Sequence, residues 1–72
     1  MTDLEMDALV GRMVHDLRNP LSAITGYAEM LEEEMDLATQ RRFVANIRRA
    51  ATEMDVLLRA VREEARERTG SV

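Results

Sequence analysis

The sequence predicts an all-α protein, an antiparallel helical hairpin that forms a homodimeric four-helix bundle. First, apolar residues recur at alternating steps of four and three in two long segments, which is the spacing of a buried helix face. Second, the chain is rich in Ala, Leu, Glu, Arg and Met, and only 3% of it is aromatic. Third, 72 residues without a cysteine build a small core and allow no disulfide, so self-association is the remaining source of stability.

The first helix is predicted at about residues 3–35, and a turn follows at about 36–39. Asp36 is expected to cap the second helix, because its carboxylate can accept hydrogen bonds from the N–H groups of the first turn. The apolar stripe of the first helix comprises Val10, Val14, Leu17, Leu21, Ile24, Ala28, Leu31 and Met35.

The second helix is predicted at about residues 40–67, and the polar end 68–72 is expected to fray. Its stripe comprises Val44, Ile47, Ala51, Met54, Leu58, Val61 and Ala65. The short turn forces the helices to run antiparallel. Both stripes are wider than one neighbour covers, so two hairpins are expected to meet face to face, with residues 1–72 as a single domain.

The formal net charge of −4 argues against nucleic acid and against anionic lipid as partners. No apolar run approaches the ~18 residues of a membrane span, and no signal peptide opens the chain. We therefore expect a cytoplasmic setting without direct membrane contact. One histidine without cysteine argues against a structural zinc site, and the run 32–34 of glutamates is interpreted as a solvated turn, so no metal is expected.

The only histidine of the chain is predicted to face solvent. On a helical projection His15 lies about 140° from the centre of the apolar stripe. Small or short residues surround it, since Gly11, Ser22 and Gly26 lie within about 40° of it and Asn19 at about the same distance. Glycine inside a helix costs roughly 1 kcal/mol relative to alanine. A clear approach to an exposed imidazole would explain that cost.

The only proline follows the histidine by five residues. Pro20 removes one helical N–H and crowds the carbonyl of Asp16. A proline inside a helix destabilises it by ~3 kcal/mol or more. We expect a helix bend at Pro20 and a deformable region around His15.

The segment "HDLRNPLSAITGYAEML" resembles the H-box of sensor histidine kinases, whose pattern is His, Glu or Asp, a hydrophobic residue, Arg or Lys, Thr or Asn, Pro, Leu. Every position from His15 to Leu21 fits. The segment "FVANIRRAATEMDVLLRAV" is similar to the second helix of the same dimerisation and histidine phosphotransfer domain, and the resemblance covers about residues 5–62.

The resemblance implies a homodimeric bundle in which His15 accepts phosphate from ATP and passes it to an aspartate of a receiver domain. Asp16 would hold the proton of the other ring nitrogen and act as general base, and Asn19 would position a water for receiver dephosphorylation. The receiver would dock on a surface that comprises Ser22, Ala23, Gly26, Tyr27 and Met30, together with Arg42, Asn46 and Arg49 of the second helix.

The resemblance makes the chain part of a histidine protein kinase, a phosphotransferase, whose ATP and Mg²⁺ are bound by a separate catalytic domain. The chain has no Gly-rich loop and no lysine, so no cofactor site is expected within it and it should not phosphorylate itself alone. Two alternatives stay open: a stand-alone histidine phosphotransfer protein, and a purely structural hairpin used for dimerisation.

Overall fold

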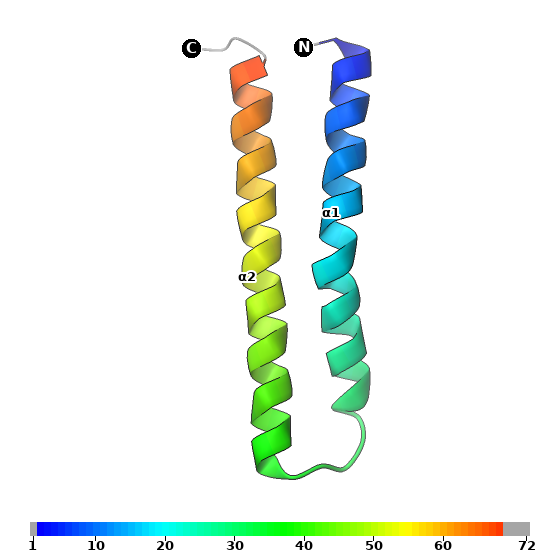
Figure 1. Cartoon of the computed structure of the whole chain (residues 1–72), viewed down its shortest axis with the longest axis vertical. Coiled ribbons are helices and arrows are strands. Elements are labelled where there is room, and N and C mark those ends of the chain that lie inside the picture. The colour runs from blue at the N-terminus through cyan, green and yellow to red at the C-terminus, as the bar shows by residue number, and fades with distance from the viewer. Residues whose placement is uncertain (1, 69–72) are drawn as a thin grey trace.

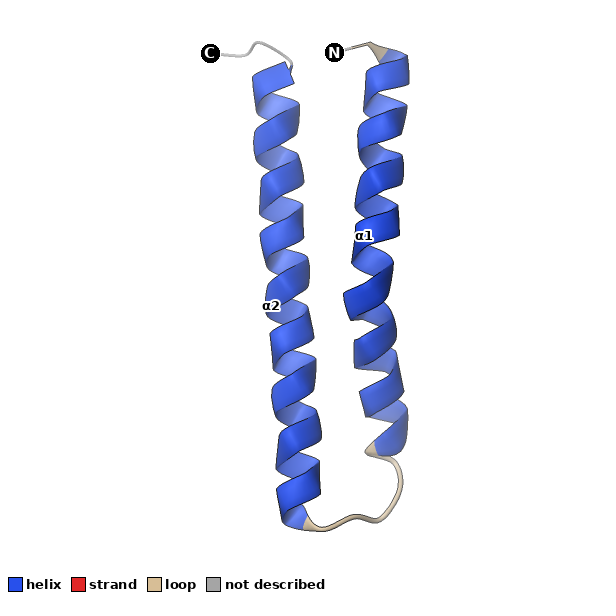
Figure 2. Cartoon of the chain, in the orientation of Figure 1, coloured by secondary structure: helices blue, strands red, loops and turns tan. Residues whose placement is uncertain are grey.

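The computed structural model of the chain describes residues 2–68 as two long helices joined by a short connection. Helix α1 covers Asp3–Met30 and helix α2 covers Leu37–Arg68. The helices lie side by side and antiparallel, so the start of α1 and the end of α2 share one end of the hairpin (Figure 1). Between residues 2 and 68 all regular structure is helical (Figure 2). The predicted all-α hairpin is confirmed.

Helix α1 begins where the sequence predicts, and a side chain caps it. The Oγ1 atom of Thr2 accepts a hydrogen bond from the N–H of Glu5, at 3.1 Å. The carboxylates of Asp3 and Glu5 lie in the first turn, where the partial positive charge of the helix end favours them.

The predicted end of α1 is wrong by five residues, because the helix ends at Met30 and not at residue 35. Its last turn holds no basic residue, and the glutamates at 32–34 follow it after Leu31. Acidic side chains are unfavourable beside the partial negative charge of a helix C-terminus. The chain leaves the helix through two tight turns, in which the N–H groups of Glu32 and Glu33 donate to the carbonyls of Glu29 and Met30.

Helix α2 begins three residues before the predicted position, directly after Asp36. The N–H of Thr39 donates to Oδ1 of Asp36 at 2.7 Å, which confirms the predicted cap. Hydrogen bonding from Thr39 holds the pKa of the Asp36 carboxyl below its ordinary value, and the charge of Arg42 adds to the effect. The predicted tail lies outside the described residues apart from Arg68, which is helical.

The interior of the hairpin is narrow. Leu9 is only 3% exposed, and Pro20 and Ala50 are also buried. The rings of Tyr27 and Phe43 pack against each other near the connection, with their centroids 5.3 Å apart.

Helix α1 keeps helical structure through Pro20, whose ring is buried in the hairpin. The bend at this residue stays a prediction. Neither helix within residues 2–68 has the length and apolar character that a membrane span requires.

A second apolar surface is left uncovered. On α1 this surface lies about 90° around the helix axis from the line through Leu9 and Pro20. On α2 it lies about 100° around the helix axis from Ala50, in the same rotational sense when each helix is viewed from its own N-terminus. Because the two helices are antiparallel, rotations of the same sense bring both lines to the same side of the hairpin. We call this surface the apolar face; its exposed residues are Val10, Val14, Leu21, Ala28, Leu37, Val44, Ala51 and Leu58.

Candidate functional site

The imidazole of His15 stands out from the middle of α1. Its side chain is 83% exposed, which confirms the predicted orientation towards solvent. By helix geometry it points about 130° away from the apolar face and about 140° away from the hairpin interior. A second hairpin placed on the apolar face would therefore leave His15 accessible.

Asp16 contacts the imidazole of its neighbour directly. The Oδ1 atom of Asp16 lies 3.2 Å from Nδ1 of His15. A carboxylate only accepts hydrogen bonds, so this contact favours the neutral tautomer with its proton on Nδ1. That tautomer leaves the lone pair on Nε2, the ring atom that points away from the backbone.

A salt bridge that the sequence pattern does not reveal joins the neighbouring turn of α1 to α2. The guanidinium of Arg12 pairs with the carboxylate of Glu64 on α2, and Arg68 also donates to Glu64 at 2.9 Å. The hydrogen bond and charge of Glu64 raise the pKa of Arg12, and the hydrogen bond from Arg12 lowers the pKa of Glu64. Arg12 thus pairs across to α2, while the carboxylate of Asp16, one turn further along α1, contacts His15 and its charge adds to the raised pKa of Arg12.

The two glycines beside His15 are not required by packing within the hairpin. A Cβ atom added to Gly11 or to Gly26 would meet no side chain or other-helix atom within 4 Å. Both positions therefore have room for alanine, whose helix propensity is higher. Because glycine has no side chain, no group projects from these two positions on either side of His15.

The predicted docking residues do not lie on one surface. By helix geometry Ser22 and Gly26 lie on the same face as His15, whereas Tyr27 is turned towards α2 and packs on Phe43. Ala23 is half-buried and Met30 exposed, on the flank that α1 shares with Arg42, Asn46 and Arg49 of α2. Asn19 is exposed one turn after His15.

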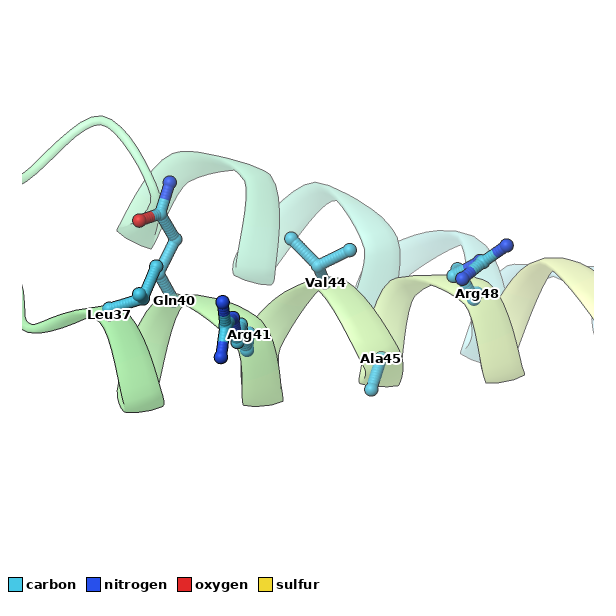
Figure 3. Close-up of a pocket in the computed structure, with 6 residues that line it drawn as sticks. All are labelled: Leu37, Gln40, Arg41, Val44, Ala45 and Arg48. Atoms are coloured by element: carbon cyan, nitrogen blue, oxygen red, sulfur yellow. The ribbon is translucent and has the colours of Figure 1, made fainter.

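One further feature lies away from His15. An open groove runs along the first turns of α2, lined by Leu37, Gln40, Arg41, Val44, Ala45 and Arg48 (Figure 3). Within residues 2–68 no three His, Asp or Glu side chains are grouped so as to hold a metal ion.

A comparison with protein families finds a match over most of the chain. The family model described as the His Kinase A (phospho-acceptor) domain matches residues 5–70. The chain has no significant match among curated proteins or solved structures.

Proposed function

The chain belongs to the His Kinase A (phospho-acceptor) domain family, and from this we propose that it is the phosphoacceptor and dimerisation module of a sensor histidine kinase, with His15 as the acceptor. The observation that carries the proposal is the pairing of an 83% exposed imidazole with a carboxylate on its Nδ1 side. A separate catalytic domain supplies ATP and Mg²⁺. Since ATP is the donor, we place the domain in the cytoplasm.

The chemistry follows from the tautomer. The lone pair on Nε2 of His15 attacks the γ-phosphorus of ATP, an N–P bond forms, and the bond from phosphorus to the leaving oxygen of ADP breaks. The ring then carries a positive charge, and Asp16 takes the Nδ1 proton to give a neutral phosphohistidine. Such a positioned base contributes typically 10²–10⁴-fold to a rate. Asp16 touches the ring directly, so it needs no large rearrangement for this role.

We further propose that phosphohistidine passes its phosphoryl group to an aspartate of a receiver domain. The face around His15 supports this step, because Ser22 and the glycines at 11 and 26 let another protein approach closely. Asn19 is exposed beside the reacting ring, and its amide can both donate to and accept from a water that attacks the aspartyl phosphate.

The homodimer is supported by the apolar face. A single hairpin leaves eight apolar side chains of both helices exposed on one side, and Val14 is 58% exposed among them. Large contiguous apolar surfaces on a soluble chain mark interaction sites. A second copy that covers this side completes a four-helix bundle.

The test is phosphate incorporation in trans. The 72-residue chain is incubated with the catalytic domain of a histidine kinase and Mg-ATP, beside its His15→Gln and Asp16→Asn variants. We expect no incorporation into His15→Gln and slow incorporation into Asp16→Asn, with unchanged circular dichroism because both side chains are exposed. Incorporation into His15→Gln at the normal rate would refute the proposal.

A further inference from the structure

Arg12 lies on the same flank of the hairpin as the histidine and one turn before it. His15 follows Arg12 by three residues and is turned about 60° further away from α2, so the Cβ atoms of the two are about 5–6 Å apart. Side chains of a helix lean towards its N-terminus, so the imidazole leans over the turn that holds Gly11 and Arg12. A group attached to Nε2 would therefore lie within reach of the Arg12 guanidinium.

The space beside that turn is open, and the guanidinium suits the group that would enter it. A Cβ atom added to Gly11 would meet no side chain or other-helix atom within 4 Å. A phosphoryl group brings three acceptor oxygens and a charge of about −1.5 to −2. Arginine keeps its charge and presents five donors in a planar fork that matches phosphate oxygens.

Glu64 holds Arg12 on this flank before any phosphate arrives. Its Oε2 atom accepts from Arg12 and its Oε1 atom accepts from Arg68 at 2.9 Å, so one carboxylate serves two guanidiniums. The three side chains are all partly exposed. Because Arg68 stays on Glu64, a movement of Arg12 towards another anion leaves no carboxylate unpaired.

The charge of Asp16 changes in the same reaction. The hydrogen bond and charge of Glu64 are the main causes of the raised pKa of Arg12, and the charge of Asp16 adds to them. In the proposed mechanism Asp16 takes the Nδ1 proton when the phosphoryl group is attached. One anion near Arg12 is thereby neutralised as another, with more charge, appears on the neighbouring ring.

From this geometry we infer that Arg12 binds the phosphoryl group on Nε2 of His15, exchanging Glu64 for phosphate oxygens and leaving Glu64 to Arg68. Arg12 forms no covalent bond and transfers no proton; it stabilises the phosphorylated state by charge and hydrogen bonds. The inference rests on the proposed function, since it requires phosphate on His15. Arg12 precedes the run from His15 to Leu21 that fits the H-box, so that run assigns it no role.

The first measurement is the equilibrium between ATP and phosphohistidine. The 72-residue chain, a histidine kinase catalytic domain, Mg-ATP and ADP are brought to equilibrium, and the phosphorylated fraction gives the equilibrium constant. We expect Arg12→Gln to lower this constant roughly three- to tenfold, because the ion pair with the phosphoryl group is lost. Arg12→Lys keeps the charge without the fork and should lie between the two. The constant does not depend on how fast the catalytic domain docks or transfers.

Glu64→Gln separates phosphoryl binding from a structural role. It breaks the same salt bridge as Arg12→Gln, so a bridge that only joined the helices would give changes of the same sign. Removal of the anion that competes for Arg12 should instead raise the constant roughly two- to threefold. In an Arg12→Gln background Glu64→Gln should have no effect, since no guanidinium is left to release.

Arg59→Gln is the matched control for loss of one arginine. Arg59 pairs with Asp55 at 3.1 Å on the outer side of α2, and its removal should leave the constant unchanged. Circular dichroism checks that each variant keeps its helices.

The outcomes separate this inference from the proposed function. An unchanged constant in Arg12→Gln, a fall in both single variants, or a rise with Glu64→Gln that persists without Arg12 overturns the inference and leaves His15 as the phosphoacceptor. A wild-type chain that takes no phosphate, or a His15→Gln variant that takes it normally, overturns the proposed function together with this inference.

Discussion

Replacing Val14 with aspartate should abolish self-association and leave the hairpin folded. The side chain of Val14 is 58% exposed in the single hairpin and lies on the apolar face. Burying a whole valine side chain is worth about 1.5–3 kcal/mol, so covering the exposed part contributes about 1–1.5 kcal/mol for each copy. A symmetric dimer contains two copies, and an aspartate placed there would also have to lose its hydration.

The expected loss is therefore at least ~3 kcal/mol, which raises the dissociation constant of the dimer more than about 100-fold. Sedimentation equilibrium measures this constant, and circular dichroism checks that helicity is kept. The control is Val56→Asp, because Val56 is 60% exposed but lies on α2 outside the apolar face. Equal weakening of the dimer by the two substitutions, or wild-type association of Val14→Asp, would show that the apolar face is not the dimer interface.

Further predictions concern the site and the caps. Asp16→Asn should slow phosphorylation of the neighbouring histidine by about 10²–10⁴-fold in a phosphotransfer assay, and equal rates would contradict its role as base. Asn19→Ala should slow receiver dephosphorylation while sparing histidine phosphorylation; equal loss of both would mean a structural role. Gly11→Ala and Gly26→Ala should each raise the free energy of unfolding by about 0.5–1 kcal/mol, since there is room for a methyl group. Both should slow transfer to the receiver, and unchanged transfer would favour a purely structural hairpin. Because the pKa of Asp36 is lowered in the folded chain, its cap stabilises the hairpin fully at pH values above 3.8, the ordinary pKa of the carboxyl. This stabilisation is lost as the pH falls through the lower pKa of the folded state. Asp36→Asn should therefore flatten the stability profile in that acidic range, as followed by thermal melts, and an unchanged profile would count against the cap.

The sequence was enough for much of the fold, because the relevant signals are local. Heptad spacing places the two helices, and a single aspartate in the right place identifies the cap of α2. The exposure of His15 follows from its angle to the apolar stripe. The end of α1 was missed because the apolar spacing continues to Met35, whereas the glutamates at 32–34 oppose the helix dipole.

The remaining differences depend on the position of the other helix. The apolar stripe of a helix points towards the core of the whole four-helix bundle. The position of the other helix in the hairpin decides which edge of that stripe is buried within a single chain. Pro20 and Tyr27 therefore face α2, although Val14 at the middle of the stripe stays exposed. The salt bridge between Arg12 and Glu64 joins residues 52 apart in sequence, and only the register of the hairpin reveals it.

The role of His15 as phosphoacceptor is tested by locating the phosphoryl group on the imidazole. Nitrogen-15 NMR of the histidine ring, recorded after incubation with a histidine kinase catalytic domain and Mg-ATP, distinguishes its two nitrogens. We expect a single phosphorylated species, with phosphorus on Nε2 of His15 and the proton contact of Nδ1 with Asp16 lost. Phosphate on Nδ1, or on any other side chain while His15 stays unmodified, would contradict it.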